Sequence, residues 1–353
     1  MRYRPLGGTG VHVSPYALGT MMFGAVGNPD RAACHAMLER ALDAGINLVD
    51  TADMYSAGES EEILGEALGG SLRSRRDDIV VATKGHFPLA EGPNRGGNSR
   101  RWLTRAVEDS LRRLQVEHID LYQVHRPDPT TDVEETLSVL TDLVRAGKIR
   151  AFGSSSFPPE QVVEAQWVAE RRGLMRFRTE QPPYSLLTRG IERSLLPVAR
   201  AHGMGVLTWS PLAFGFLTGR HRRGTGAAAG TARAGLRPER FDPSLPENSA
   251  KYDAVEALVA LSEEVGCTLP QLAVAFVVAH PAVSSVILGP RTPEQLDDLL
   301  AGAGLTLGDD VLDRIDEIVA PGVDLYRANT AWTPPALTDA DLRRRPLGER
   351  SAA

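Results

Sequence analysis

The stretch HIDLYQVHRPDPTTDVEETLSVLTDLVRAGKIRAF, residues 118–152, decides the fold of this chain, because it holds a complete strand–helix–strand unit. It opens with the short apolar run His118–Tyr122 and closes with a second one, Ile149–Phe152. Between the runs, apolar residues recur at helical spacing: Val133, Leu137, Leu140 and Val144. Gly147 follows as the expected helix stop. A helix between two short strands predicts that the strands lie parallel in one sheet.

The same alternation of short and long apolar patterns runs through the chain. Eight short runs are predicted strands: Tyr16–Leu18, Asn47–Val49, Ile79–Ala82, His118–Tyr122, Ile149–Phe152, Arg176–Glu180, Gly205–Leu207 and Ser285–Ile287. Several are almost wholly apolar, as expected of strands buried on both faces. A further helix is predicted from Leu103, Val107, Leu111 and Leu114, with Asn98 or Ser99 as its N-cap. The pattern predicts an α/β fold, a single (β/α)8 TIM barrel, with a doubly wound open sheet as the competing architecture.

Three segments depart from this alternation. Arg2–Val13 predicts a β-hairpin before the first barrel strand. After the seventh strand, residues 213–250 form a long insertion that contains the run GTGAAAG at 224–230, which predicts a mobile loop. The proline-rich and charged residues 321–353 predict an irregular C-terminal tail, which leaves residues 1–320 as one barrel domain.

Composition restricts the class of protein. Among 353 residues, 42% are hydrophobic, which is enough for a large core, and the net charge is −6, which argues against nucleic-acid binding. Cys34 and Cys267 are expected to be small buried residues rather than a disulfide or a nucleophile. We find no apolar leader and no run of about 18 apolar residues, so we expect a cytoplasmic protein without a membrane partner. Neither a metal site nor an oligomeric state is predicted.

Polar residues close the predicted strands at the end where barrels carry their active sites. The second strand runs into Asp50–Tyr55, the third into Thr83–Lys84, and the fourth into Gln123–Arg126. Alone, each side chain fits an ordinary role: a lysine as a surface charge, a histidine as a structural residue, Asp50 as a turn cap. Four such groups at three consecutive strand ends favour a catalytic interpretation.

Asp50, Tyr55, Lys84 and His125 together suit proton transfer to an oxygen. A free tyrosine has a pKa of about 10 and is a poor acid at neutral pH. A nearby lysine ammonium would stabilise the phenolate and lower that pKa, and a carboxylate would hold the ammonium in place. The histidine would orient a substrate carbonyl. Since no side chain supplies a hydride, a cofactor must do so.

Longer motifs carry a resemblance to a known family. In chain order they are DTADMY at 50–55 with GESE at 58–61, VATK at 81–84, DLYQVHRPD at 120–128, KIRAFGSSSF at 148–157, WSPL at 209–212, LTGR at 217–220 and GPRTPEQL at 289–296. Together they resemble the aldo-keto reductase family over roughly residues 1 to 320. The resemblance implies NADPH-dependent, reversible hydride transfer between nicotinamide and an aldehyde, a ketone or an alcohol. Tyr55 would be the general acid and base, Lys84 would lower its pKa, Asp50 would pair with Lys84, and His125 would orient the carbonyl.

The resemblance also implies an extended NADP(H) site without a Rossmann glycine motif. Trp209 would stack on the nicotinamide, Gln181 and Ser155 would bind its carboxamide, and Arg291 with Arg220 would meet the 2′-phosphate. The full implied cofactor set is Gly19, Thr20, Met21, Asp50, Ser155, Ser156, Gln181, Trp209, Ser210, Pro211, Leu212, Arg220, Gly289, Arg291, Gln295 and Asp298. Ser156 and Leu299 each stand where many members have an asparagine.

Two other functions stay open. One is an NADP(H)-binding regulatory subunit with little turnover, because the WSPL segment also resembles potassium channel beta subunits. Those relatives often replace the catalytic histidine with asparagine, whereas this chain keeps His125, which favours an enzyme. The other is a barrel lyase or isomerase without nicotinamide. A small-molecule carbonyl substrate is expected, but the sequence does not identify it. Candidate pocket walls are Phe23, His86, Phe87 and Trp332, and the loop 213–250 is hypothesised to close over bound cofactor.

Overall fold

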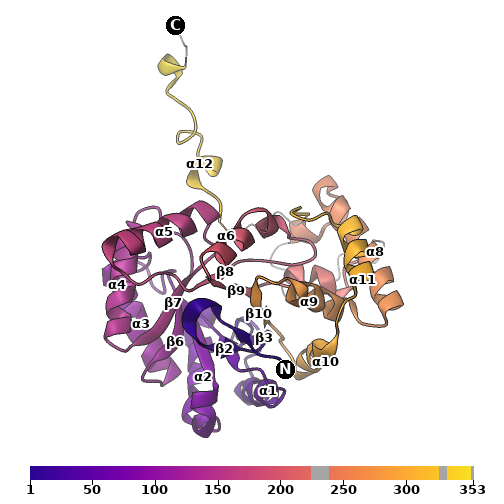
Figure 1. Cartoon of the computed structure of the whole chain (residues 1–353), viewed down its shortest axis with the longest axis horizontal. Coiled ribbons are helices and arrows are strands. Elements are labelled where there is room, and N and C mark those ends of the chain that lie inside the picture. Colours follow the sequence, from indigo (N-terminus) through magenta and orange to yellow (C-terminus); the bar gives the residue numbers. More distant parts are fainter. Residues whose placement is uncertain (224–237, 326–331, 351–353) are drawn as a thin grey trace.

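Eight parallel strands close into a barrel in the computed structural model, which describes residues 1–223, 238–325 and 332–350 (Figure 1). The barrel strands are β3 (Tyr16–Gly19), β4 (Leu48–Asp50), β5 (Val80–Gly85), β6 (Ile119–Val124), β7 (Ile149–Ser155), β8 (Thr179–Gln181), β9 (Gly205–Thr208) and β10 (Val283–Leu288). Sequential strands are neighbours, and β10 pairs with both β9 and β3. The predicted TIM barrel is therefore confirmed, and the open sheet is wrong because no strand of this sheet is left as an edge.

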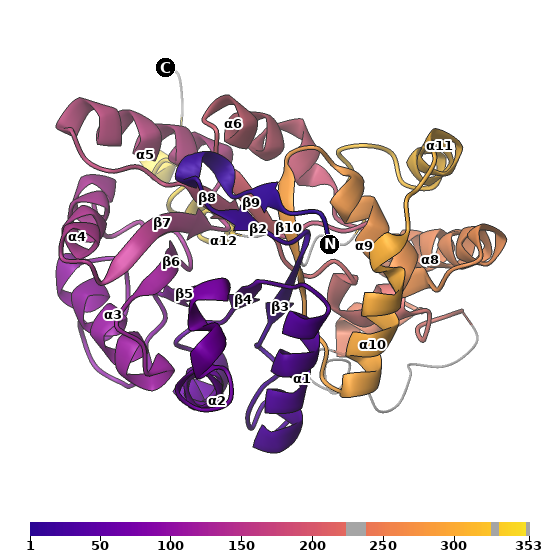
Figure 2. The same ribbon diagram turned by 60° about the horizontal axis from the view of Figure 1, so that its bottom comes forward.

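Helices surround the barrel on its outer face (Figure 2). They are α1 (Arg31–Asp43), α2 (Glu59–Gly69), α3 (Arg100–Leu114), α4 (Val133–Arg145), α5 (Pro159–Arg172), α6 (Leu195–Ala201), α8 (Pro246–Val265), α9 (Leu269–Ala279), α10 (Pro293–Ala301) and α11 (Asp309–Ile318). Their apolar sides and the outward faces of the strands form the main hydrophobic core. Among the described residues, no single helix is long and apolar enough to cross a membrane; α8 and α9 reach that length and apolarity only together, across a bend of 90°.

The unit from β6 to β7 shows how the sequence sets the element ends. Asp132 is the N-cap of α4, and its carboxylate accepts a hydrogen bond of 2.8 Å from the backbone N–H of Glu134. Gly147, with a φ of +76°, turns the chain out of the helix and into β7. Ser99, one of the two predicted caps, begins α3 by accepting a hydrogen bond from Trp102. These local signals confirm the predicted helix boundaries.

The N-terminal hairpin closes one end of the barrel. Its strands, β1 (Arg4–Pro5) and β2 (His12–Val13), pair antiparallel as predicted. The backbone N–H of Gly8 in the hairpin donates to the carbonyl of Gly203 just before β9, at 2.9 Å. A second hydrophobic cluster joins the hairpin to the barrel interior: Leu6, Val13, Ala17, Leu48, Ala82, Leu121, Leu207 and Ile287. With this end filled by apolar side chains, a site can open only at the carboxyl ends of the strands.

The described parts of segment 213–250 are more ordered than the single loop predicted from sequence. Residues Ala213–Thr218 form a 3₁₀ helix, Pro238–Phe241 form another, and α8 already begins at Pro246. The reason is an aromatic cluster, in which the rings of Phe216 and Phe241 stack with centroids 4.7 Å apart. The run GTGAAAG at 224–230 lies outside the described residues, so its mobility and its closure over cofactor stay predictions.

Residues just after α11 attach to the barrel loops. The backbone N–H of Arg189 donates to the carbonyl of Val323 at 3.1 Å, and that of Leu325 donates to Leu187 at 2.9 Å. Asp324 accepts a hydrogen bond of 2.6 Å from Gly190. Farther along, the short helix α12 (Pro335–Thr338) projects away from the barrel with the C-terminus (Figure 1).

Candidate active site

The barrel interior changes from apolar to polar between the hairpin end and the carboxyl end. Six interior residues of the second cluster are Ala17, Leu48, Ala82, Leu121, Leu207 and Ile287. Two positions later along the same strands come Gly19, Asp50, Lys84, Gln123, Trp209 and Gly289. Since side chains of a strand alternate between faces, residues two apart share the interior face. The barrel thus gathers candidate residues from six strands at one end.

Lys84 lies at the centre of this polar layer. Its Nζ donates to Asp50 Oδ1 at 2.5 Å, to the carbonyl of Thr51 at 2.7 Å and to Tyr55 Oη at 3.4 Å. The Lys84 side chain is fully buried, and that of Asp50 is 3% exposed. Charge-assisted hydrogen bonds inside a buried site fix both partners in place. The structure therefore brings together the lysine, aspartate and tyrosine predicted from sequence.

Two amides hold the other oxygen of the Asp50 carboxylate. Gln181 Nε2 donates to Asp50 Oδ2 at 2.8 Å, and Gln123 Nε2 donates to the same oxygen at 3.4 Å. Gln181 was predicted to bind a nicotinamide carboxamide, and in this structure its side-chain amide donates to the Asp50 carboxylate. Gln123 was not predicted as a site residue. A signal was present, because it stands two residues before His125 and so shares its face of the strand.

Tyr55 begins a strained turn between β4 and α2. Ser56 and Ala57, which follow it, have φ values of 48° and 57°, in the left-handed region that costs non-glycine residues energy. Ser56 Oγ donates to the carbonyl of Phe23 at 2.9 Å, which ties the turn to the loop after β3. This turn places the Tyr55 hydroxyl next to the ammonium of Lys84.

Two opposing effects set the pKa of Tyr55. Burial raises the pKa of Tyr55, and the nearby Lys84 ammonium lowers it by less, so the net pKa is raised above its ordinary value. Burial lowers the pKa of Lys84, but the charges of Asp50 and Tyr55 outweigh that effect and raise it. The pair is thus a protonated phenol beside a charged ammonium at neutral pH. The effect of Lys84 therefore has the predicted direction, and desolvation, which is the larger effect, decides the net direction.

His125 faces the same space from the end of β6. Its ring lies edge-on to Tyr55, with centroids 6.0 Å apart, and edge-on to Phe87 at 5.0 Å. Burial and the nearby Lys84 charge hold the pKa of His125 well below its usual range, so the imidazole is neutral. Its Nδ1 has no hydrogen-bond partner in the part of the chain that the structure describes. A neutral imidazole in this position can hydrogen-bond a substrate oxygen.

The predicted nicotinamide end of the cofactor site lies beside these residues. Thr20 bonds Ser60 Oγ at 2.8 Å, and Ser155 Oγ donates to the carbonyl of Gln181 at 2.9 Å. The hydroxyl of Ser156 and the indole N–H of Trp209 are buried without a partner among the residues described. Buried polar atoms of this kind normally have a partner, so these two fit a bound carboxamide or ribose.

The predicted phosphate end lies on the next strand around the barrel. Ser210, Pro211 and Leu212 follow β9, and β9 pairs with β10, whose end leads through Gly289 to Arg291 and α10. The Arg291 side chain is exposed next to the N-terminus of α10, a place that favours phosphate. Its backbone N–H donates to Gln295 Oε1 at 2.8 Å.

Other residues of the predicted cofactor region pack against a neighbouring helix or lie exposed. Asp298 Oδ1 accepts a hydrogen bond of 3.1 Å from Gln271, which ties it to α9, and Leu299 is buried in the main core. Met21 is 40% exposed after β3, and Arg220 is exposed after the 3₁₀ helix that follows β9. Phe23 was a candidate pocket wall with ordinary loop packing as the favoured interpretation, and it is fully buried in the core, as packing requires.

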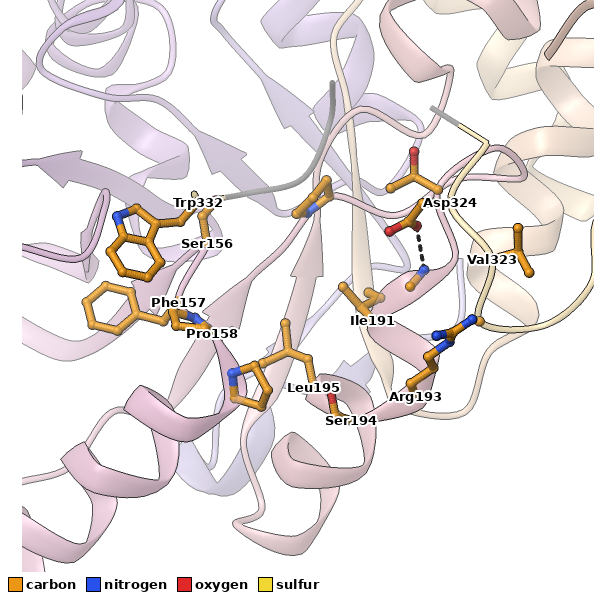
Figure 3. A pocket seen from close by; sticks show the side chains of 15 residues that line it. Ser156, Phe157, Pro158, Ile191, Arg193, Ser194, Leu195, Val323, Asp324 and Trp332 are labelled. Carbon is orange, nitrogen blue, oxygen red and sulfur yellow. Dashed lines mark hydrogen bonds between the residues drawn. The ribbon is translucent and has the colours of Figure 1, made fainter. Parts of the chain in front are cut away.

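A cavity of about 630 Å³ lies beside the polar layer rather than over it. It opens between the loops after β7 and β8 and the residues after α11, and Phe157, Arg193, Asp324 and Trp332 line it (Figure 3). Of the predicted catalytic and cofactor residues, only Ser156 belongs to its lining. Trp332, a candidate pocket wall, faces this cavity next to Phe157. Strand ends, not this cavity, define the candidate active site.

Comparison with known proteins agrees with this geometry. The family model described as aldo/keto reductase family matches residues 16–320. The chain is 38% identical to an uncharacterized oxidoreductase, YrpG, of Bacillus subtilis (strain 168), over 94% of this chain and 100% of that protein. It is 35% identical to probable voltage-gated potassium channel subunits beta of Oryza sativa subsp. japonica and of Arabidopsis thaliana, in each case over 90% of this chain and 97% of the relative.

The match covers the whole barrel, including every strand end that contributes to the polar layer. The chain belongs to the aldo/keto reductase family, and it is an oxidoreductase of that family by its relatives.

Proposed function

We propose that this chain catalyses reversible, NADPH-dependent hydride transfer between nicotinamide and an aldehyde, a ketone or an alcohol, with Tyr55 as general acid and base. The observation that carries the proposal is the position of Lys84 Nζ, 3.4 Å from Tyr55 Oη and 2.5 Å from Asp50 Oδ1. An ammonium held this way stabilises the phenolate that forms when Tyr55 gives up its proton.

Each residue has a defined part in reduction. Trp209, Ser155 and Ser156 would hold a reduced nicotinamide, which when bound would supply the hydride for the carbonyl carbon. The Tyr55 hydroxyl donates its proton to the carbonyl oxygen, and Lys84 stabilises the negative charge left on Tyr55. Asp50 keeps Lys84 charged, and neutral His125 orients the carbonyl oxygen. In oxidation of an alcohol, the phenolate of Tyr55 takes the proton back.

The preference for NADP over NAD rests on the residues after β10. The exposed guanidinium of Arg291 beside the α10 N-terminus suits a 2′-phosphate, because both the side chain and the helix end favour negative charge. Trp209, Ser155 and Ser156 lie at the strand ends nearest the polar layer and fit the nicotinamide end.

Turnover of NADPH with a panel of aldehydes tests the proposal. We expect the wild type to oxidise NADPH, and Tyr55→Phe to lose activity by roughly 10²–10⁴-fold, since it lacks the acid. Tyr3→Phe is the matched control, because its hydroxyl contacts only the carbonyl of Gly45, outside the site. A Tyr55→Phe enzyme that is as fast as wild type would show that the assigned acid is wrong.

A second candidate follows from the relatives that are named as potassium channel subunits beta. In that function the chain would bind NADP(H) as a regulatory subunit with little turnover. The presence of His125 beside Tyr55 favours the enzyme. Tight NADPH binding, seen as quenching of tryptophan fluorescence, together with no turnover across the panel would favour the regulatory subunit instead.

A further inference from the structure

Arg126 lies at the mouth of the site, directly after His125. Its guanidinium carbon is 5.8 Å from the ring centroid of Phe87 and 5.9 Å from that of Trp209. Phe87 in turn packs against the His125 ring at 5.0 Å. The cation therefore lies between the side of the site where His125 would orient a carbonyl and the side where Trp209 would receive the nicotinamide.

The charge of Arg126 has no counter-ion in the described chain. One nitrogen, Nη1, donates to the carbonyl of His125 at 2.6 Å, and no carboxylate in residues 1–223, 238–325 or 332–350 forms an ion pair with it. Tyr55 and, less strongly, Glu180 act on it only without a hydrogen bond, and Glu180 accepts hydrogen bonds from Ser154 and from the backbone of Phe157. Burial lowers the pKa of Arg126, but a guanidinium keeps its charge.

Three other largely buried arginines show the usual arrangement. Arg76 pairs with Asp120 at 2.9 Å, Arg113 with Glu61 at 2.7 Å, and Arg189 with Glu192 at 2.8 Å. A desolvated charge without a partner is costly, so it favours any anion that can reach it. Arg126 differs from these three because no carboxylate of the described chain pairs with it, and it lies where substrate would enter.

We propose that Arg126 binds an anionic group of the substrate, a carboxylate, and that the enzyme prefers aldehydes or ketones that carry one. This inference rests on the proposed function. A guanidinium binds a carboxylate through two parallel charge-assisted hydrogen bonds, and its remaining N–H groups are available for them. The rings of Phe87 and Trp209 have their centroids 5.8 and 5.9 Å from the guanidinium carbon, and their apolar surface lowers the local polarity, which strengthens the contact.

Two substrates of equal shape test this. We would measure kcat/KM for 4-carboxybenzaldehyde and for its neutral amide analogue, 4-formylbenzamide, at fixed ionic strength. Wild type should favour the carboxylate by tenfold or more, and Arg126→Gln should lower that ratio at least tenfold, mainly through KM of the charged substrate. Arg171→Gln is the matched control, because its guanidinium lies 5.0 Å from the exposed Trp167 ring, away from the site; it should leave the ratio unchanged.

A binding measurement tests the inference without any turnover. We would compare the dissociation constants of benzoate and benzamide for the complex of the protein with NADPH. Tighter binding of benzoate that Arg126→Gln abolishes would support the carboxylate site at Arg126, and a lack of aldehyde reduction in the same protein would then count against the proposed function alone. The inference would be overturned if the preference for the carboxylate over the amide were the same in wild type and Arg126→Gln. An equal loss for both substrates together with weaker NADPH binding would also overturn it, because Arg126 would then serve the cofactor.

Discussion

Lys84 carries a buried positive charge that the surrounding residues sustain. Its ammonium reaches three oxygen atoms, and the carboxylate among them is held by the amides of Gln181 and Gln123. Removing one partner of such a buried pair typically costs about 3–5 kcal/mol, because the other charge remains buried. The same contacts that keep Lys84 charged place it against Tyr55, so stability and chemistry depend on one cluster.

Asp53, three residues after Asp50, gives a prediction about pH and stability. Burial raises the pKa of Asp53 to about 8, with the charge of Glu61 adding to the effect. The folded state therefore keeps a proton that the unfolded chain releases near pH 4. This contribution to stability is fully present below the unfolded pKa and is lost as pH rises through about 8.

We expect Asp53→Asn, which mimics the protonated side chain, to gain a few kcal/mol in unfolding free energy relative to wild type between pH 5 and pH 8. Urea unfolding at both pH values measures the difference. An equal difference between the two proteins at pH 5 and pH 8 would show that Asp53 is not protonated in the folded state.

The sequence predicted those site residues that can be recognised from their residue type and their position after a strand. Asp50, Lys84 and Tyr55 could be predicted because they end consecutive strands. The lowering of the Tyr55 pKa by Lys84 could also be predicted, but the larger, opposing effect of burial could not, because it depends on how deeply the hydroxyl is buried. The bond from Gln181 to Asp50 joins β8 to β4, and no local pattern reveals such a contact.

At the scale of elements, strained turns cluster at the carboxyl ends of the strands. Ser56 and Ala57 follow β4, Ser156 follows β7 with a φ of 62°, and Ser210 follows β9 with a φ of 58°. Non-glycine residues hold such angles only where the surroundings fix them, and functional sites are a common place for this. The strain lies in the loops that carry Tyr55, Ser156 and Trp209, which supports their assignment to the site.

The pairing of β5 with β6 gives a prediction about packing. A Cβ at Gly85 would lie 2.0 Å from Tyr122 Oη and 3.2 Å from Asp53 Oδ2. Gly85→Ala should therefore lower the unfolding free energy by about 1–3 kcal/mol through overpacking. Tyr122 Oη is buried without a hydrogen-bond partner among the described residues, so Tyr122→Phe alone should cost less than about 1 kcal/mol.

Chemical denaturation of the double variant provides the control. Removing the hydroxyl makes room for the new methyl group, so Gly85→Ala with Tyr122→Phe should recover at least half of the stability lost by Gly85→Ala. If the stability losses of the two single variants simply add in the double variant, the close approach between position 85 and the Tyr122 hydroxyl would be contradicted.

Sequence patterns located all eight barrel strands but ended several of them early. β5 was predicted to end at Ala82 and ends at Gly85; β6 was predicted to end at Tyr122 and ends at Val124. The added residues include Lys84 and Gln123, which are polar yet buried. Their burial depends on partners from other strands, so hydrophobic periodicity cannot detect it.

At the scale of the whole molecule, the barrel has one closed and one open end. Leu6 and Val13 of the hairpin fill the closed end, and the polar layer occupies the other. The alternation of strands and helices predicted this architecture. The attachment of residues 321–325 could not be predicted, because it depends on loop 187–190, far away in the sequence.

Truncation distinguishes the attached residues from the projecting tail. A chain that ends at Trp332 should keep the unfolding free energy of the full chain within about 0.5 kcal/mol, since the deleted residues described by the structure are largely exposed. A chain that ends at Ala320 loses the contacts of Val323, Asp324 and Leu325 and should lose roughly 2–4 kcal/mol. Urea denaturation of the three proteins checks this, and equal stability of the two truncated chains would contradict it.

The pH dependence of alcohol oxidation in Lys84→Met tests the central claim most directly. With benzyl alcohol and NADP⁺, kcat should rise with pH until the Tyr55 phenolate forms. Without the ammonium, the pKa of Tyr55 rises further, so Lys84→Met should be at least about 100-fold slower at pH 7 and still gain rate where wild type has levelled off. Asp50→Asn with Lys84→Met, which leaves neither charge of this pair buried alone, should show the same shift. A profile that coincides with wild type would contradict the account, because Lys84 would then not act on Tyr55.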